Sequence, residues 1–406
     1  MENLYKNFIW MAAANITSSL FGLILFIYLG RTLAPQSIGL LSYSFTLIFF
    51  LANFVDLGLS TYGAREIAKD KSRISEYVSE IVSFRLLVAA VLAILLGVAV
   101  TLSCHLGLLR NLILGSLGIL IVFSLATEWA YQGVEKMHMV FASLVTTSLL
   151  QLGIIYIFVK GSADLMRVPI LYFIATLPMI MIFLIRLKFT FRIKKIDLER
   201  INKYLASSLV IWSIYLFVQV YNSLDIFIIG WFRGTEEVGY FTIARRITGG
   251  AALLMVFLAN AALPRLSYTF ADNMPQFRAA TNRFLKLAVI FTVIVLVPII
   301  FFGNKVIEIT VGVKYLPAAL PLKIMAIGLL FVLFNLPFST GLIACGMEKK
   351  VLSQAAASAA VSVGSNFLLV PRYGMAGAAM SFVLAEALAL SWILYIYEKR
   401  IRIHNQ

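Results

Sequence analysis

The sequence predicts an all-α integral membrane protein that crosses the bilayer about twelve times, and two observations support this fold class. Of the 406 residues, 61% are hydrophobic and 13% are charged, and the mean hydropathy is +0.93, a composition that soluble domains do not have. The apolar residues also form runs of about 20 with few charges, the helix length that crosses about 30 Å of hydrocarbon. The short alternating segments of a membrane β-barrel are absent from the sequence.

Taken in chain order, the apolar runs give twelve predicted spans. They cover residues 8–30, 37–58, 81–103, 109–130, 137–159, 167–186, 204–231, 237–263, 284–303, 317–337, 351–370 and 374–397. We do not expect the first run to be a cleaved secretory signal, because it is long and further spans follow it. Cys104 is predicted near the outer end of the third span and Cys345 on the cytoplasmic side, so no disulfide is expected between them.

Lysine and arginine set the expected orientation. If the N-terminus is cytoplasmic, most of the 34 basic residues fall in cytoplasmic segments, and the largest group lies at 186–203 between spans six and seven. The protein is therefore predicted to have both termini in the cytoplasm. We interpret the net charge of +15 as this topological bias, with some attraction for anionic membrane lipids, and not as nucleic-acid binding.

The sequence contains no sign of catalytic, metal or nucleotide chemistry. Its three histidines, His105, His138 and His404, do not have metal-ligand spacing, and no G-x-x-x-x-G-K-[ST] phosphate loop occurs. We therefore expect neither an enzyme nor a cofactor, and any uphill movement must draw its energy from an ion gradient or another source.

Internal repetition predicts two similar halves. Three matches support it, namely Gly30 with Gly230, Gly39 with Gly239, and Leu51-Ala52-Asn53 with Leu258-Ala259-Asn260. An even span count and the basic segment between spans six and seven place the joint there, which gives an N-terminal lobe at 1–195 and a C-terminal lobe at 196–406. Halves that enter from the same side are parallel repeats, and such repeats hold a site between them.

Several segments resemble one family in order and spacing. They are Leu29-Gly30-Arg31, Asp56-Leu57-Gly58-Leu59, Trp129-Ala-Tyr-Gln-Gly133-Val-Glu135-Lys136, Asn222-Ser-Leu-Asp225-Ile-Phe-Ile-Ile-Gly230, Val238-Gly239-Tyr240-Phe241, Leu263-Pro264-Arg265-Leu266-Ser267 and Pro371-Arg-Tyr-Gly374-Met-Ala-Gly377. Together they resemble the bacterial polysaccharide (O-antigen) flippases of the Wzx type, within the multidrug/oligosaccharidyl-lipid/polysaccharide exporter superfamily.

The resemblance implies two six-helix lobes around a central cavity and transport by alternating access. It implies a substrate made of undecaprenyl-diphosphate-linked oligosaccharide, moved from the cytoplasmic to the outer leaflet of the bacterial inner membrane for O-antigen or other surface polysaccharide synthesis. A polysaccharide polymerase and its chain-length machinery are further partners that the resemblance suggests.

Arg245 and Arg246 are the strongest candidates for contact with such a substrate. A diphosphate is a permanent anion, and the arginine fork binds phosphate through two hydrogen bonds. Both arginines lie inside span eight, where charge is costly and therefore indicates function. Adjacent helical residues point about 100° apart, so we expect one to face the cavity and the other to pack or reach the headgroups. The alternative is that both extend to the membrane surface.

Asp225 in span seven lies at a depth similar to that of the two arginines. An Asp225 pair with one of them could act as a gate that holds the outer side closed until a diphosphate competes, or it could be a static structural ion pair. Arg85, one turn into span three, could extend to the inner surface or meet substrate, and Arg31 at the end of span one could meet a headgroup or only mark the topology.

Glu386 is predicted near the bilayer midplane in span twelve, among alanines that allow close helix packing. It could bind a proton or a sodium ion that drives transport, or it could be a neutral, hydrogen-bonded structural carboxyl. Asn53 and Asn260 suit a hydrated cavity that tolerates sugars, although amides also bridge helices.

Three other functions compete with transport of a lipid-linked oligosaccharide. A multidrug exporter of the same superfamily should carry acids in its cavity, but the first span has none and the deep charges of span eight are basic. A polysaccharide polymerase needs a large external loop, and the longest one predicted here is only 304–316. A scaffolding protein would not require arginines inside the membrane.

Overall fold

The computed structural model describes residues 2–103, 107–186, 197–272, 274–344 and 347–403, and every regular element in these ranges is helical. The chain forms two compact units, Met1–Gln219 and Val220–Gln406, which divide inside the long helix α9 (Leu198–Arg233). The predicted joint at 195/196 falls before α9, at the edge of residues outside the described ranges. Cys104 and Cys345 also lie outside them.

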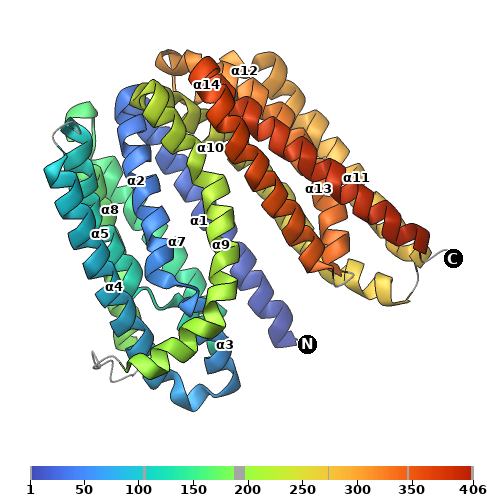
Figure 1. The fold of residues 1–406 in the computed structure, drawn as a ribbon, viewed down its shortest axis with the longest axis horizontal. Coiled ribbons are helices and arrows are strands. Elements are labelled where there is room, and N and C mark those ends of the chain that lie inside the picture. Colours follow the sequence, from blue (N-terminus) through green and yellow to red (C-terminus); the bar gives the residue numbers. More distant parts are fainter. Residues whose placement is uncertain (1, 104–106, 187–196, 273, 345–346, 404–406) are drawn as a thin grey trace. The chain divides into compact units, whose positions relative to one another are not determined.

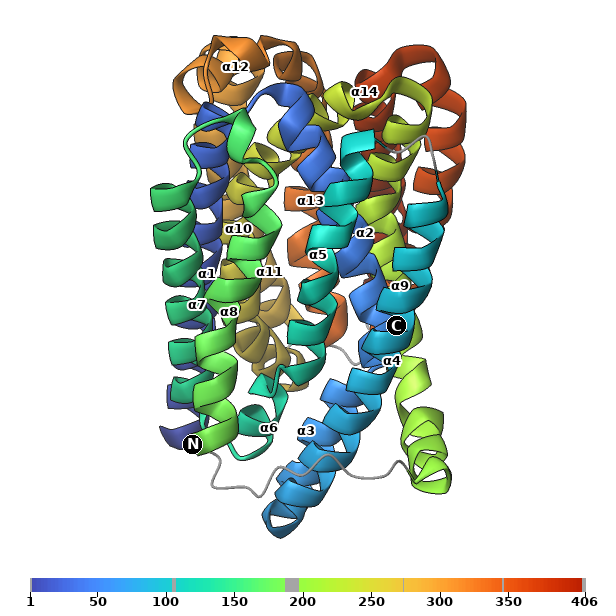
Figure 2. The same cartoon turned by 90° about the vertical axis from the view of Figure 1, so that its left-hand side faces the viewer.

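The first unit holds eight helices before α9 (Figure 1). They are α1 (Glu2–Thr32), α2 (Pro35–Asp56), α3 (Leu59–Lys69), α4 (Ile74–Leu102), α5 (Gly107–Leu125), α6 (Glu128–Gly133), α7 (Met137–Phe158) and α8 (Arg167–Arg186), with single turns at Lys71–Arg73 and Ser162–Asp164. Helix α7 packs against α1 and α8, and α5 packs against α2, α4 and α8 (Figure 2). Small polar residues allow close packing, since the hydroxyls of Ser44 on α2 and Ser116 on α5 lie 3.0 Å apart.

The first half of α9 packs against the turn between α2 and α3. Helix α2 ends in two left-handed residues, Leu57 and Gly58, with φ of 48° and 77°. A Cβ on Gly58 would lie 2.7 Å from the Ser208 carbonyl oxygen, so only glycine fits this close approach of α9. The Trp212 indole Nε1 donates to the Asn53 carbonyl oxygen at 2.9 Å. These contacts explain why the first unit extends into α9 and does not end in the basic segment before it.

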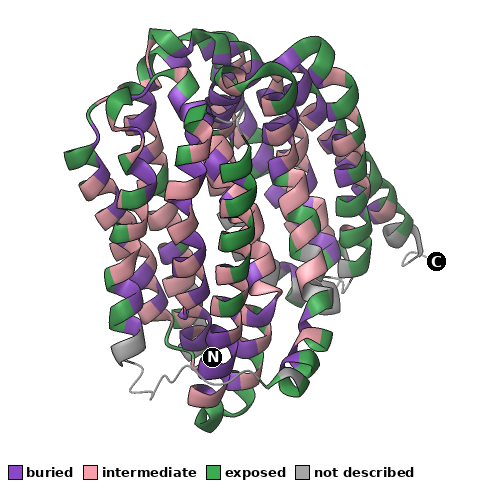
Figure 3. Cartoon of the chain, turned by 60° about the vertical axis from the view of Figure 1, so that its left-hand side comes forward, coloured by how far each residue is buried: buried purple, intermediate pink, exposed green. Residues whose placement is uncertain are grey.

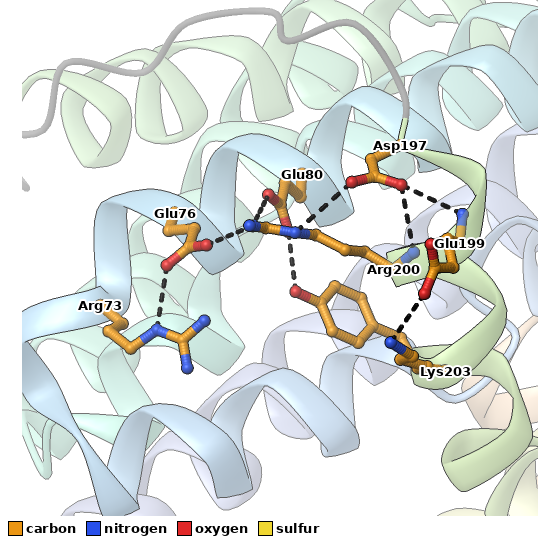
Figure 4. A network of polar contacts seen from close by, with 8 residues as sticks. Arg73, Glu76, Glu80, Asp197, Glu199, Arg200 and Lys203 are labelled. Carbon is orange, nitrogen blue, oxygen red and sulfur yellow. Dashed lines mark hydrogen bonds and ion pairs between the residues drawn. The ribbon is translucent and has the colours of Figure 1, made fainter.

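A polar network also holds the first turns of α9 on the start of α4 (Figure 4). The Arg200 guanidinium lies between Glu76 and Glu80, with 3.0 Å from Nη1 to the Glu80 Oε1 atom. Glu80 in turn accepts a 2.7 Å hydrogen bond from the Tyr204 hydroxyl. The hydrogen bond to Glu76 raises the pKa of Arg200 above its ordinary value. Half of the Arg200 side chain is exposed, so the network orients α9 more than it stabilises the fold.

The second unit contains the end of α9 and the remaining helices (Figure 1). They are α10 (Thr235–Asp272), α11 (Met274–Phe291), a π turn (Thr292–Leu296), α12 (Val297–Thr310), a 3₁₀ turn (Val313–Ala318), α13 (Ala319–Ala344) and α14 (Glu348–Ile403). Helix α13 packs against α10, α11, α12 and α14. Helix α14 contains a break at Gly374, where φ is 58° and ψ is −137°, so two successive helical segments share this label.

The twelve predicted spans are helical except at residues 57, 58, 103, 126, 127 and 159, and the last two correspond to the two segments of α14. In the described ranges, nine helical stretches are long and apolar enough to cross a membrane, and α8 adds a shorter apolar helix over Arg167–Phe183. One of the nine, Lys349–Lys399, contains the Gly374 break. The loop between spans seven and eight is shorter than the predicted 232–236, because α9 continues to Arg233, α10 begins at Thr235 and Gly234 alone makes the turn.

Exposed and buried residues alternate along the same helices, so each long helix has a packed side and an exposed side (Figure 3). On α4 the exposed side carries large apolar residues such as Ile94, Leu95 and Val98. Its buried side contributes Ala89 to a core with Ile48 of α2 and Leu120 of α5. Apolar surface of this extent is what lipid-facing helices need.

Candidate functional site

The candidate site is built on α9 and α10, which follow each other through the Gly234 turn. Asp225 precedes this turn by nearly as many residues as Arg245 follows it, so two antiparallel helices place them at the same level. Asn222 is three residues before Asp225 and therefore lies on the same face of α9. The predicted equal depth of Asp225 and the arginines is thus a consequence of a tight helical hairpin.

Arg245 binds both polar residues of α9. Its Nη1 donates to the two carboxylate oxygens of Asp225, at 2.6 Å for Oδ1, and its Nη2 donates to Asn222 Oδ1 at 3.3 Å. The Ile226 backbone N–H also donates to Asp225 Oδ1, at 2.8 Å. A quarter of the Arg245 side chain stays exposed, compared with 11% for Asp225. The buried carboxylate therefore holds a cation that is itself only partly buried.

A second polar contact lies on the same face of α9. The Tyr221 hydroxyl donates to Glu386 Oε1 on the second segment of α14. Tyr221 is four residues before Asp225 and therefore lies on the same face of α9. Sequence reasoning did not single out Tyr221. Its spacing from Asp225 on one helix face was the available signal.

Of the two adjacent arginines, Arg245 is the one that Asp225 binds, while Arg246 is exposed on a neighbouring face of α10. This agrees with the expected 100° between their directions. The side chain of Asn260 lies outside the described residues. The other candidates belong to the first unit, where Arg31 is exposed in the last turn of α1 and the Asn53 amide donates to the Phe49 carbonyl oxygen of its own helix at 2.8 Å.

Arg85 is buried inside the first unit and does not extend to a surface. Its Nη2 donates to the Phe123 carbonyl oxygen at 2.6 Å, and its Nη1 donates to the Ala126 carbonyl oxygen and the Ser60 hydroxyl, both at 3.3 Å. Its Nε lies 3.7 Å from Asp56 Oδ1. The first two acceptors are at the end of α5, where carbonyl groups lack helical partners. The guanidinium would have to leave these acceptors before it could meet a headgroup.

In the described part of the chain, no group of three or more His, Cys, Asp or Glu side chains is placed to hold a metal ion. The polar residues of the second unit instead combine one cation, two carboxyl groups, one amide and one hydroxyl, supplied by Arg245, Asp225, Glu386, Asn222 and Tyr221. Such a set can bind an anionic group and exchange a proton or a cation.

Residues 4–270 match the sequence profile of the family described as "Polysaccharide biosynthesis protein". The chain belongs to this family. Residues 213–371 also match the MatE family. Both matches include Asp225 and Arg245, whereas Glu386 lies beyond them.

Two curated proteins are similar to this chain. The "Putative O-antigen transporter" of Escherichia coli (strain K12) is 24% identical over 67% of this chain and 66% of its own length. The "Capsular polysaccharide biosynthesis protein CapF" of Staphylococcus aureus is 22% identical over 98% of this chain and 100% of its own.

Solved structures show which fold this family member has. The lipid II flippase MurJ in an inward closed conformation has a TM-score of 0.78 at 15% identity, covering 95% of this chain and 86% of that one. An inward-facing multidrug resistance MATE transporter of the MOP superfamily has a TM-score of 0.71 at 17% identity, covering 97% and 98%. The chain is therefore a multi-pass membrane protein with the fold of these two proteins, and its family match confirms the resemblance identified in its sequence.

Proposed function

We propose that this protein translocates undecaprenyl-diphosphate-linked oligosaccharide from the cytoplasmic to the outer leaflet of a bacterial inner membrane by alternating access. The observation that carries the proposal is Arg245, a cation with a quarter of its side chain exposed, held by Asp225 on the α9–α10 hairpin of a polysaccharide biosynthesis family member. The similarity to the lipid II flippase MurJ and to the putative O-antigen transporter supports a lipid-linked saccharide as the class of substrate. The expected orientation has both termini in the cytoplasm, and no catalytic step is proposed.

In this proposal, the diphosphate competes with Asp225 for Arg245. The guanidinium has five N–H donors, and within the described residues it uses them only on Asp225 and Asn222. A diphosphate group offers two oxygens to the guanidinium, as a carboxylate does, and carries more negative charge than a carboxylate. The Asp225–Arg245 ion pair therefore represents the substrate-free state. When substrate breaks this pair, the relative stability of the transport states changes.

Coupling to a proton or sodium gradient is assigned to Glu386, whose carboxyl accepts from Tyr221 beside the same cluster. The MatE match leaves export of organic cations as the second candidate, favoured by the two carboxyl groups of the cluster. Against it, Asp225 is already neutralised by Arg245, so the cluster has little attraction for a further cation. A polymerase and chain-length proteins remain expected partners at the membrane.

A strain that lacks this gene should accumulate undecaprenyl-diphosphate-linked oligosaccharide in the inner leaflet, and re-expression should clear it. The measurement is protection of the saccharide from a membrane-impermeant glycosidase in intact spheroplasts, with oligosaccharides of foreign composition as a specificity control. An unchanged leaflet distribution, together with new sensitivity to cationic drugs, would support the multidrug exporter. If the rate of clearance does not change when a pH or sodium gradient is imposed, coupling at Glu386 is excluded.

Replacing Asp225 with asparagine should increase access to α10 from outside, because an amide holds the Arg245 cation less strongly than a carboxylate. A suitable probe is Gly249→Cys in a background with Cys104→Ser and Cys345→Ser. Gly249 is exposed one turn after Arg245, and a side chain there meets nothing within 4 Å. With a membrane-impermeant thiol reagent, the labelling rate should rise in Asp225→Asn.

The matched control for this experiment is Asp164→Asn, which removes a carboxylate that pairs with Arg167 in a turn of the first unit. Equal labelling rates in the parent and Asp225→Asn, with transport also unchanged, would mean that the Asp225 pair is static. Labelling only in inverted vesicles would reverse the proposed orientation.

A further inference from the structure

Two turns of the second unit are joined by side chains that no part of the proposed function uses. One is the Gly234 turn between α9 and α10, where φ is 86°, and the other is the Gly374 break inside α14. Arg233 is the last residue of α9, and Glu237 lies in the first turn of α10. Both point across to the α14 break.

Arg233 binds the end of the first α14 segment. Its Nη2 donates to the Arg372 carbonyl oxygen at 2.9 Å, and its Nε donates to the Val370 carbonyl oxygen at 3.4 Å. The last carbonyl groups of a helix lack partners within it. Pro371 lies between the two acceptor residues, and proline is a residue type that interrupts helices. A cation placed there also interacts favourably with the helix dipole.

Glu237 binds the start of the second α14 segment in the complementary way. Its Oε2 accepts a 2.8 Å hydrogen bond from the Met375 backbone N–H. The first N–H groups of a helix are its unpaired donors, and a carboxylate is the favoured partner at that end. One α9–α10 turn thus supplies the cation for one helix end and the anion for the other.

The fit is too close for any residue but glycine at the break. A Cβ on Gly374 would lie 2.2 Å from the Glu237 carboxylate, and one on Gly377 would lie 2.4 Å from the Leu369 carbonyl oxygen. The backbone of Gly374 is also left-handed, a conformation that side chains disfavour. These contacts account for two of the glycines in the segment Pro371-Arg-Tyr-Gly374-Met-Ala-Gly377.

We propose that Arg233 and Glu237 are positioning residues, which hold the second segment of α14 at the height where Glu386 meets Tyr221 of α9. One hairpin makes all of these contacts with α14. Arg233 and Tyr221 lie on α9, Glu237 lies in the first turn of α10, and Met375 and Glu386 lie on the second segment of α14. A helix advances about 1.5 Å per residue, so the position of Met375 sets the position of Glu386. The effect on transport rests on the proposed function, whereas the position of α14 can be tested without it.

The test uses a thiol probe between the two contacts. Ser381 on α14 is fully buried, and cysteine nearly matches serine in size. In a Cys104→Ser, Cys345→Ser background, Ser381→Cys should resist N-ethylmaleimide. Glu237→Ala should raise its labelling rate on the order of tenfold, which corresponds to about 1.4 kcal/mol of local opening. Glu237→Gln should stay near the parent rate, because its amide oxygen still accepts from the Met375 N–H.

Two controls separate a change in position from general loosening. Glu236→Ala removes the neighbouring carboxylate, which accepts from Tyr240 of its own helix, and should leave the rate unchanged. Ser124→Cys is a fully buried probe in the first unit and should stay protected in every variant. Gly374→Ala should open α14 as Glu237→Ala does, whereas Gly364→Ala should not, because a Cβ there meets nothing within 4 Å.

The positioning role is overturned if the Ser381→Cys rate is the same in Glu237→Ala and the parent, or if Glu237→Gln behaves like Glu237→Ala. A parallel rise at Ser124→Cys would show unfolding and would also overturn it. If Glu237→Ala speeds labelling of Ser381→Cys but leaves transport unchanged, the position of α14 does not control the function of Glu386. Failure of the parent protein to clear lipid-linked oligosaccharide would count against the proposed function alone.

Discussion

Replacing Arg245 with alanine should reduce transport of lipid-linked oligosaccharide by at least about tenfold, because a hydrogen bond to a charged group contributes about 1.5–3 kcal/mol. Part of this loss would come from Asp225, which is 11% exposed and would be left without its cation. The double variant Asp225→Asn/Arg245→Ala removes both charges. It should restore the amount of folded protein in the membrane without restoring transport.

Lysine at position 245 should restore transport only in part, since an ammonium group lacks the planar fork that binds two oxygen atoms at once. The matched control is Arg167→Ala, which removes an exposed arginine from a turn of the first unit and should transport normally. Transport is measured as clearance of the inner-leaflet pool, and protein amount by quantitative blotting of membranes. Full transport by the double variant would remove Arg245 from the substrate site.

Replacing Arg85 with alanine should destabilise the first unit by about 3–5 kcal/mol, the usual cost of removing one partner from a buried polar network. The Arg85 side chain is 2% exposed, and its loss would leave the Phe123 and Ala126 carbonyl groups without this donor and Asp56 without its cation. We expect a lower membrane level and a lower midpoint of thermal unfolding for the protein purified in detergent. Arg85→Met keeps most of the volume but none of the donors, and should be nearly as unstable.

A matched control for Arg85 is Arg65→Ala, which removes a half-exposed arginine that pairs with Glu66 on α3. An exposed ion pair contributes about 0–1 kcal/mol, so the unfolding midpoint should change little. If Arg85→Ala were as stable as the parent but did not transport, Arg85 would contact substrate directly. The two arginines thus have opposite expected signatures, with loss of protein for Arg85 and loss of transport for Arg245.

Much of the candidate site in the second unit could be predicted from the sequence. The shared depth of Asp225 and Arg245 follows from their positions on either side of a tight turn, and their pairing follows from the cost of an unpaired charge in the membrane. Sequence reasoning could not choose between Arg245 and Arg246. That choice depends on the rotation of α10 about its axis, which packing against neighbouring helices sets.

Arg85 shows the limit of reasoning from span boundaries. Its place one turn into a predicted span suggested a side chain at the inner surface, yet the guanidinium lies among carbonyl groups of α5. The acceptors come from residues far along the chain, at the end of a different helix. No local sequence pattern indicates that the carbonyl groups at the end of α5 will lie beside Arg85.

Hydropathy and the required length of a membrane-crossing helix are local properties, so the apolar runs alone predicted the all-α class and a helix at each of the twelve predicted spans. The family resemblance could also be identified from the sequence, because it rests on the order of short segments along the chain. The contacts of Arg233 and Glu237 with the α14 break, of Tyr221 with Glu386, and of α9 with Gly58 needed the folded molecule. Each joins residues on different helices, and their meeting depends on how helices pack and rotate, which arises from all the contacts of a unit together.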